Sequence, residues 1–330
     1  MAALFIDRRD ARLSLDANSI RITTGGEVTS IPLRQIDRLF IRGAATIDTG
    51  LLSRLWGQGS GVLLLSGRQS EPTARFHGKP HNDVRRRMVQ TLTACDPARA
   101  LDLARRVVEA KLLAQTGAIR RLTSIRPGVR LGSIGLSRIV TGSIKMLPQA
   151  GSIDALRGHE GACARVYWQA LTAAFAPGLG FTGRNRRPPR DPVNAVLSLA
   201  YTIATFEAGR QVQRVGLDPM IGFLHSPSFG RESLACDLIE PLRPRIDLWA
   251  ERLFRERSLR KEHFTQGDQQ ACLLGKAGRA AFYEALDETL PVWSRWLGQT
   301  AGALNRLLDA QPGPLFGSDL EADDDPDPVS

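Results

Sequence analysis

The pattern of hydrophobic and polar residues changes near residue 80. Before that point, apolar residues alternate with polar ones in short runs, separated by turn signals such as Asp16-Ala17-Asn18 and Gly25-Gly26. Residues 36–41 and 62–65 are apolar enough to form central strands of a sheet, and residues 73–76 fit a last strand. Leucines at helical spacing between these strands predict one helix, over residues 48–56, that caps the sheet.

From about residue 82 the spacing of apolar residues becomes helical. A basic helix is predicted from Arg85 toward Cys95, and a helix over residues 98–116 follows Pro97. The second helix places Leu101, Val108 and Leu112 on one side, with Arg105, Arg106 and Lys111 on the other. Residues 117–152 are broken by glycine and proline, and further helices are predicted over residues 153–175, 191–215, 232–257 and 278–308.

These patterns predict an α+β protein, with a small N-terminal β-rich domain followed by a larger all-α helical domain. We place the β-domain at residues 1–78, as a scaffold that offers a dimer or partner surface. A connecting basic helix or linker covers residues 79–96, and the helical domain covers residues 97–317. Residues 318–330 are polar and acidic, and are predicted to be a disordered tail.

The charge of the chain indicates a polyanionic partner. The formal net charge is +10, although the last twelve residues hold six acids and no base, so the rest of the chain stands at +16. A body this basic, dominated by arginine, favours nucleic acid as the partner over a merely solubilising surface. The acidic tail is expected to keep the protein soluble, with weak competition against DNA phosphates as the alternative role.

Composition also excludes several classes of protein. The longest apolar runs fall well short of the roughly 20 residues needed to span a bilayer, and the N-terminus carries charges too early for a secretory signal. The four cysteines, Cys95, Cys163, Cys236 and Cys272, are scattered, without a Cys-x-x-Cys pair. This spacing argues against a disulfide framework or zinc ribbon and predicts a cytoplasmic protein with no membrane partner.

Residues 222–244 hold the main candidates for catalysis. His225 lies in a turn rich in Gly, Pro and Ser, and Asp237 and Glu240 follow one helical turn apart. Residues at i and i+3 share a helix face, so both carboxylates can point into one cleft. An imidazole above two carboxylates suits Mg²⁺ or Mn²⁺. The alternative is a surface histidine beside two solvated acids.

Glu160 is a third candidate ligand, on a separate helix. The run Gly158-His159-Glu160-Gly161 is taken as the opening of that helix, where an acid also complements the positive helix end. The small residues Gly161 and Ala164 on the same flank predict a close neighbouring helix, which would leave Glu160 at a packed seam.

Residues 181–194 form an arginine-rich loop before a helix. Arg184, Arg186, Arg187 and Arg190 are interleaved with three prolines. Prolines stiffen a loop and guanidinium groups match phosphate oxygens, so the loop is predicted to clamp a DNA backbone. A basic linker is the alternative, and Asn194 is interpreted as a capping residue of the following helix.

Four separated blocks carry a family resemblance. They are HEGACARVYW with Glu160, RRPPRDPVNAVLSLAYT from Arg186, GFLHSPSFGRESLACDLIEPLRP with His225, and residues 274–286 with Gly278-Arg279. In this order they resemble the signature blocks of the CRISPR-associated integrase family, the universal spacer-acquisition endonuclease "Cas one". The N-terminal runs LFIDRRDARLSL and RLFIRGAATIDTGLL look like the β-domain of that family, so the resemblance covers residues 3 to 290.

The resemblance implies a β-domain joined to a larger helical catalytic domain, a homodimer, and assembly with double-stranded DNA and the small partner "Cas two". It implies Mg²⁺ or Mn²⁺ held by Glu160, His225 and Glu240, with Asp237 as a supporting acid. One departure is Pro241, which directly follows Glu240 and is expected to kink the helix there. Cys163 and Cys236 lie beside the proposed ligands and are interpreted as packing residues.

The implied reaction is integration of short DNA duplexes, the new spacers, into a CRISPR repeat. Attack by a 3′-hydroxyl on a scissile phosphate gives transesterification, and attack by water gives nicking. Two alternatives stay open: a metal-dependent nuclease that only hydrolyses DNA, and a non-catalytic DNA-binding subunit whose acids serve the structure.

Overall fold

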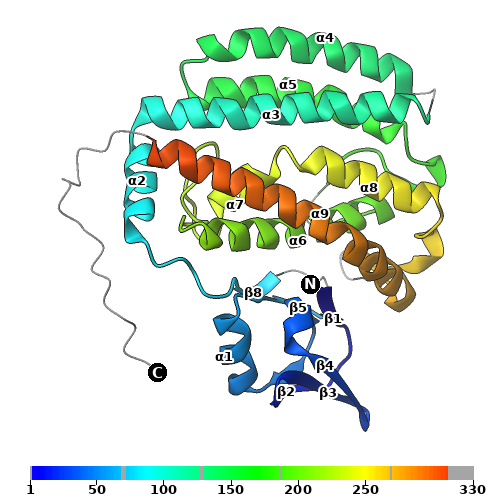
Figure 1. The fold of residues 1–330 in the computed structure, drawn as a ribbon. Helices are drawn as coiled ribbons and strands as arrows, with labels where there is room; N and C mark the ends of the chain where they lie inside the picture. The colour runs from blue at the N-terminus through cyan, green and yellow to red at the C-terminus, as the bar shows by residue number, and fades with distance from the viewer. Residues whose placement is uncertain (1, 68–71, 127–128, 186–187, 268–269, 311–330) are drawn as a thin grey trace, which may run out of the picture.

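The computed structural model of the chain describes residues 2–67, 72–126, 129–185, 188–267 and 270–310. It consists of a β-rich N-terminal part and a larger helical part, so the predicted α+β fold class is confirmed (Figure 1). The domain boundaries remain predictions, and the predicted acidic tail at residues 318–330 lies outside the described residues. Within the described ranges, no helix combines the length and apolar content needed to cross a bilayer.

The N-terminal part contains two four-stranded sheets. The first has the order β1-β5-β7-β8, in which β5 and β7 are central, as predicted. The second has the order β4-β3-β2-β6. The bounds are β1 Ala2–Ile6, β2 Ala11–Asp16, β3 Ser19–Thr24, β4 Glu27–Pro32, β5 Ile36–Arg42, β6 Ala45–Ile47, β7 Gly61–Leu65 and β8 Pro72–Phe76, with helix α1 at Thr49–Gly57.

The first sheet separates two hydrophobic cores. Side chains alternate along a strand, so Leu39 and Ile41 of β5 enter the small N-terminal core while Phe40 between them joins the core of the helical part. Gly61 of β7 allows helix α6 to come close, because a Cβ at Gly61 would lie 2.8 Å from Cζ of Phe206. The two parts therefore share this sheet as a common wall.

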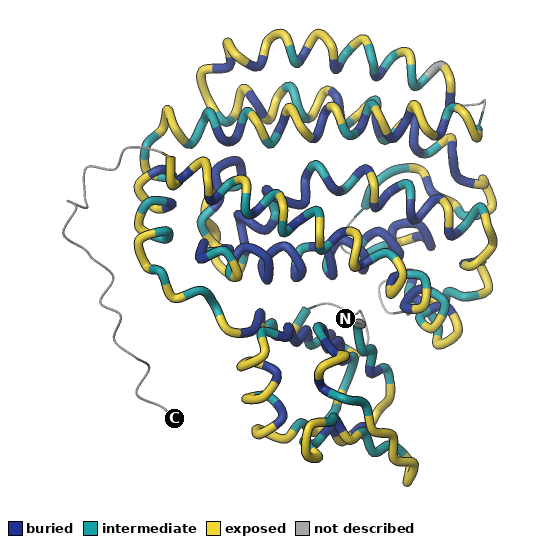
Figure 2. Tube along the Cα trace, in the orientation of Figure 1, coloured by how far each residue is buried: buried dark blue, intermediate teal, exposed yellow. Residues whose placement is uncertain are grey.

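The helical part has two layers (Figure 1). Helices α3, α4 and α5 form one layer, and α6 to α9 form the layer next to the sheet. Figure 2 shows that α6 is buried along most of its length. The bounds are α2 Val84–Cys95, α3 Pro97–Thr123, α4 Arg130–Met146, α5 Ile153–Thr172, α6 Pro192–Arg214, α7 Ser233–Ile239, α8 Arg243–Arg255 and α9 Lys276–Asp309.

The helical part departs from the sequence predictions in three places. Residues 117–152 were expected to be broken, but α3 continues to Thr123 and α4 follows. The predicted helix over residues 232–257 is two helices, and the break falls at Glu240 and Pro241, so the expected kink is confirmed. The helical part is also not purely helical, because β9 (Phe264–Gln266) and β10 (Cys272–Leu274) pair as a short antiparallel sheet.

Candidate active site

Two carboxylates from different helices meet on one ammonium group. Nζ of Lys111, on α3, contacts Oε1 of Glu160 on α5 and Oε2 of Glu240 at the end of α7. The Lys111 side chain is 11% exposed, and those of Glu160 and Glu240 are 22% and 5% exposed. The fold therefore brings Glu160 and Glu240 together, although they lie eighty residues apart in the chain.

Glu240 is buried and ionised. Nε of Arg243 donates a hydrogen bond of 2.9 Å to its Oε1, while Lys111 contacts Oε2. Burial raises the pKa of Glu240, but the positive charges of Arg243 and Lys111 outweigh burial and lower this pKa from 4.5 to about 2. Burial likewise lowers the pKa of Lys111, and its two carboxylate partners raise it by more. The pair stays charged at neutral pH.

Asp237 fixes the loop that carries His225. Its buried carboxylate accepts hydrogen bonds from the backbone N–H groups of Phe223 (2.7 Å), Leu224 (3.0 Å) and His225 (3.0 Å). Oδ1 of Asp237 also lies 2.7 Å from Nδ1 of His225. A carboxylate only accepts, so Nδ1 carries the proton and the lone pair of Nε2 is directed away from Asp237.

Two other residues hold the start of this loop. A Cβ at Gly222 would lie 2.8 Å from the carbonyl oxygen of His225 and 2.9 Å from Oδ2 of Asp237, so only glycine fits there. Gln90 of α2 is buried. Its side-chain oxygen accepts a hydrogen bond of 2.7 Å from the backbone N–H of Asp218, and its side-chain nitrogen donates one of 2.9 Å to the backbone carbonyl of Asp218. Its amide also donates to the carbonyl of Ile221 at 2.8 Å. Helix α2 therefore helps to position His225.

A buried polar network lies behind Glu240. The guanidinium of Arg243 stacks over the ring of Tyr201, 4.5 Å from its centroid. The hydroxyl of Tyr201 bonds to Asp247 of α8, and the hydroxyl of Tyr167 donates to the same carboxylate at 2.6 Å. Burial raises the pKa of Asp247 to about 6, against the hydrogen bonds from Tyr167 and Tyr201 and the charge of Arg243.

The surroundings of Glu160 differ from those predicted. Helix α5 begins at Ile153, after the capping residue Ser152, so Glu160 lies about two turns inside it. Gly161 is exposed, and a Cβ there would have no atom within 4 Å. The predicted seam at Gly161 is therefore wrong. The neighbour of Glu160 is the buried Lys111 of α3.

Lys111, Arg243 and Asp247 were not identified from the sequence. The predicted helix has Lys111 on the side opposite Val108 and Leu112, which is wrong, because Lys111 is buried together with them. A signal was nevertheless present, because Lys111 continues the buried stripe of Ala104 and Val108 at helical spacing, followed by Gln115. A charged residue in phase with a core stripe indicates a buried partner of opposite charge.

The donor set fits a hard divalent cation. Within the described ranges, no three His, Cys, Asp or Glu side chains gather around one point as a preformed metal site. Glu160 and Glu240 nevertheless already share one cation, the Lys111 ammonium. Oε2 of Glu240 is buried, and the Lys111 ammonium is the cation that contacts it. Two carboxylates and an oriented imidazole are ligands that suit Mg²⁺ or Mn²⁺.

The arginine-rich loop is partly folded onto α6. Arg184 donates to Oδ1 of Asn194 at 2.7 Å and to the hydroxyl of Ser198 at 3.0 Å. Asp191 caps α6, while Asn194 bonds back to the loop through the carbonyl of Gly183 at 2.8 Å, so the predicted cap was misplaced by three residues. Arg190 is exposed. Arg186 and Arg187 lie outside the described residues.

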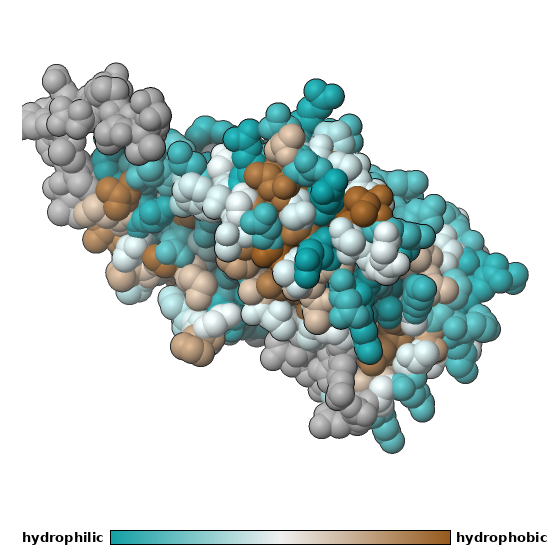
Figure 3. Space-filling view, turned by 90° about the horizontal axis from the view of Figure 1, so that it is seen from below, coloured by the Kyte–Doolittle hydropathy of each residue, from teal (hydrophilic) through white to brown (hydrophobic). Residues whose placement is uncertain are grey.

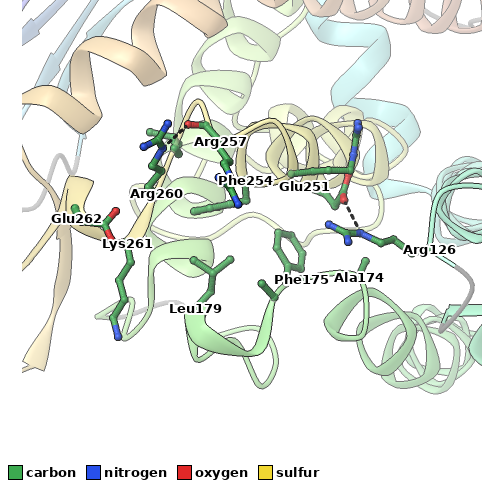
Figure 4. Close-up of a pocket in the computed structure, with 13 residues that line it drawn as sticks. Arg126, Ala174, Phe175, Leu179, Glu251, Phe254, Arg257, Arg260, Lys261 and Glu262 are labelled. Carbon is green, nitrogen blue, oxygen red and sulfur yellow. Dashed lines mark hydrogen bonds and ion pairs between the residues drawn. The ribbon is translucent and has the colours of Figure 1, made fainter.

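A pocket of about 240 Å³ lies between the ends of α5 and α8 (Figure 4). One wall of the pocket is apolar and consists of Phe175, Leu179 and Phe254. Nε of Arg126 lies 3.6 Å from Oε1 of the buried Glu251. The exposed charged residues that line it include the cations Arg257, Arg260 and Lys261 and the acid Glu262. This end of the helical part therefore presents positive charge to solvent.

The sequence matches a family model described as CRISPR associated protein Cas1 over residues 4–288. A curated relative is the CRISPR-associated endonuclease Cas1 1 of Thermodesulfovibrio yellowstonii. It is 33% identical over 313 residues, which cover 94% of this chain and 98% of the relative.

Solved structures share the fold. A Cas1 protein from Thermotoga maritima superposes with a TM-score of 0.82 at 19% identity, over 96% of this chain and 99% of its own. A casposase bound to an integration product superposes with a TM-score of 0.81 at 21% identity, over 93% of this chain and 90% of its own. A chain of a Cas6-RT-Cas1–Cas2 complex superposes with a TM-score of 0.77 at 20% identity, over 93% of this chain and 35% of its own.

Proposed function

The chain belongs to the CRISPR associated protein Cas1 family, and from this premise we propose that it is a divalent-metal-dependent DNA endonuclease and integrase of CRISPR adaptation. It joins the 3′-hydroxyl ends of short duplex DNA, the new spacers, to the CRISPR repeat by transesterification. The observation that carries the proposal is the meeting of Glu160 and Glu240 on one buried cation beside the loop of His225.

Glu160, Glu240 and His225 would hold Mg²⁺ or Mn²⁺. The ion, when bound, polarises the scissile phosphate and offsets charge on the attacking and leaving oxygens. Glu240 offers an ionised carboxylate, because Arg243 and Lys111 keep its pKa low despite burial. Asp237 keeps the proton of His225 on Nδ1, so Nε2 is available as a ligand.

The chemistry is an in-line displacement at phosphorus. The 3′-oxygen of the spacer forms a bond to the phosphorus of the repeat, and the bond from that phosphorus to its former 3′-oxygen breaks, so bonds balance without an external energy source. Water in place of the 3′-hydroxyl gives hydrolysis. The mechanism needs no nucleophilic side chain, and we assign none.

The test uses purified protein, with and without the Cas2-type partner, on short duplex DNA and supercoiled plasmid in Mg²⁺, Mn²⁺ or EDTA. Glu160→Ala, His225→Ala and Glu240→Ala should each abolish strand joining while the protein stays folded. Glu109→Ala, an exposed acid on α3, is the matched control and should keep full activity. Full joining by His225→Ala would refute its assignment as a ligand.

The two alternative functions give different products. A nuclease that only hydrolyses would nick plasmid equally well with a 3′-blocked donor, whereas an integrase loses the joined product. A non-catalytic subunit would bind DNA without metal and leave both strands intact. The reported likeness to a casposase bound to an integration product supports the integrase, at the level of fold.

The partners we propose are double-stranded DNA, a second copy of the chain and a Cas2-type protein, in the cytoplasm. Arg190 and the cations around the pocket at Arg260 and Lys261 supply contacts for a DNA backbone. Figure 3 shows apolar patches among polar side chains on the face seen from below. In the N-terminal part, the large hydrophobic side chains of Trp56 and Phe76 are exposed. They support a protein–protein surface there.

A further inference from the structure

Lys111 occupies the place where the two acids of the site face each other. Its ammonium contacts Glu160 and Glu240, and its stem leaves the buried face of α3. Without a cation between them, two carboxylates this close would repel each other and resist burial. Lys111 therefore supplies a positive charge between the two carboxylates that holds them together.

A divalent cation would need the same oxygens. Oε1 of Glu240 is already engaged by Arg243 at 2.9 Å, so Oε2 is the oxygen left for a metal, and Oε2 is the one that Lys111 contacts. An ammonium and a divalent cation repel each other strongly at contact distance in a buried site. Both cannot bridge the two carboxylates at once.

We propose that Lys111 is a positioning residue whose ammonium holds Glu160 and Glu240 together in the metal-free protein and moves off them when a divalent cation binds, so that Lys111 sets the affinity for the metal. The inference rests on the proposed metal-dependent function. Lysine suits this role because its ammonium sits on a flexible four-carbon stem. Arg243 stays on Glu240 throughout, so that carboxylate keeps its position during the exchange.

Mn²⁺ affinity of the DNA-free protein tests the proposal, with free Mn²⁺ measured by electron paramagnetic resonance. Lys111→Met removes the competing charge at similar length, and its Kd for Mn²⁺ should fall about tenfold or more below that of the natural chain. Lys111→Arg keeps the charge and should not tighten binding. Lys145→Met, at an exposed position of α4, should leave Kd unchanged. An unchanged or higher Kd for Lys111→Met overturns the proposal.

A second measurement uses the natural chain, in case Lys111→Met does not fold. Reductive methylation followed by mass spectrometry reports how accessible each ammonium is. The rate at Lys111 should rise several-fold when Mn²⁺ saturates the protein, with Lys145 as the internal reference. A rate at Lys111 that does not respond to Mn²⁺ overturns the displacement.

Glu160→Gln and Glu240→Gln separate the two proposals. If the natural chain binds Mn²⁺ and either variant loses this binding, the metal site stands, and equal Kd values for Lys111→Met and the natural chain overturn only the role of Lys111. If the natural chain and both glutamine variants bind Mn²⁺ equally weakly, the metal-dependent function and the role of Lys111 fall together. A merely structural role of Lys111 would lower thermal stability without tightening Kd.

Discussion

Asp237 acts through the backbone of the loop that carries His225. Its two oxygens accept from three successive N–H groups and from the imidazole, which leaves no clear acceptor direction for a metal. Residue types and spacing in the sequence identified the acids and the histidine but not their partners. The reason is that Lys111 and Arg243 come from positions whose role depends on how α3 and α8 pack.

Gly222→Ala tests the position of the loop. The new Cβ would lie 2.8–2.9 Å from the His225 carbonyl and the Asp237 carboxylate, so the loop has to shift. We expect stability to fall by about 1–3 kcal/mol and strand joining to fall at least tenfold. Gly161→Ala, next to Glu160 on an exposed helix face, is the control and should stabilise the protein slightly. Full activity of Gly222→Ala would contradict the role of the close contact.

Asp247→Asn tests the buried network behind Glu240. The pKa of Asp247 is raised from 3.8 to about 6, so its contribution to stability is complete below pH 3.8 and is lost as pH rises through about 6. The asparagine variant does not titrate. Its stability relative to the natural chain should therefore improve by roughly 3 kcal/mol between pH 4 and pH 7.5. Thermal unfolding across this range measures the difference, with Glu109→Gln as a control, and a constant difference would contradict the raised pKa.

At the scale of elements, local patterns predicted the strands and most helices, because alternation and helical spacing are properties of short segments. Helix α4 was missed because three glycines were interpreted as breaks. Gly132 instead allows close packing, since a Cβ there would lie 2.6 Å from Cβ of Ala170 on α5. The break between α7 and α8 was predictable from Pro241, which lacks a backbone N–H.

Gly132→Ala tests the contact between α4 and α5. The added methyl group overlaps Ala170, and the expected loss of stability is about 1–3 kcal/mol, although alanine favours the helix. Gly142→Ala lies on the same helix, where a Cβ meets no atom within 4 Å, and should stabilise the protein by up to about 1 kcal/mol. Urea unfolding of both variants measures these two changes in stability. Equal stability of the two would show that α4 does not rely on Gly132.

Across the whole molecule, positive charge is expected to govern DNA binding. The exposed Arg190 and Lys261 are better targets than Arg184, whose bonds to Asn194 and Ser198 hold the loop in place. For Arg190→Gln with Lys261→Gln, the slope of log affinity against log salt should flatten by about 0.9 per lost phosphate contact, for any DNA sequence. Arg34→Gln, exposed in the N-terminal part, is the control. An unchanged slope in the double variant would exclude these two contacts.

The two parts of the molecule are joined by a buried ion cluster that no local pattern predicts. The carboxylate of Glu207, on α6, accepts a hydrogen bond of 2.7 Å from Nε of Arg38 on β5. Arg210 lies one turn further along α6 and forms ion pairs with Glu207 and Asp37. Glu207 and Arg210 are completely buried. The domain boundaries predicted from the sequence put these four residues in two different domains, and the packing of α6 on the first sheet brings them together.

Glu207→Gln tests this junction. Burial raises the pKa of Glu207, but Arg210 and Arg38 outweigh it and lower the pKa from 4.5 to about 2. The stability that Glu207 contributes is therefore complete above pH 4.5 and is lost as pH falls toward 2. Glutamine leaves two buried guanidinium groups with less negative charge, so the free energy of unfolding at pH 7 should fall by about 3–5 kcal/mol. The difference in the free energy of unfolding between the variant and the natural chain should become smaller below pH 4.5, where Glu207 of the natural chain loses its charge. Glu284→Gln, an exposed position of α9, should show no such gap at any pH. Urea unfolding at pH 7, 4 and 3 measures the difference, and a gap of the same size at all three values would mean that the charge of Glu207 does not hold the two parts together.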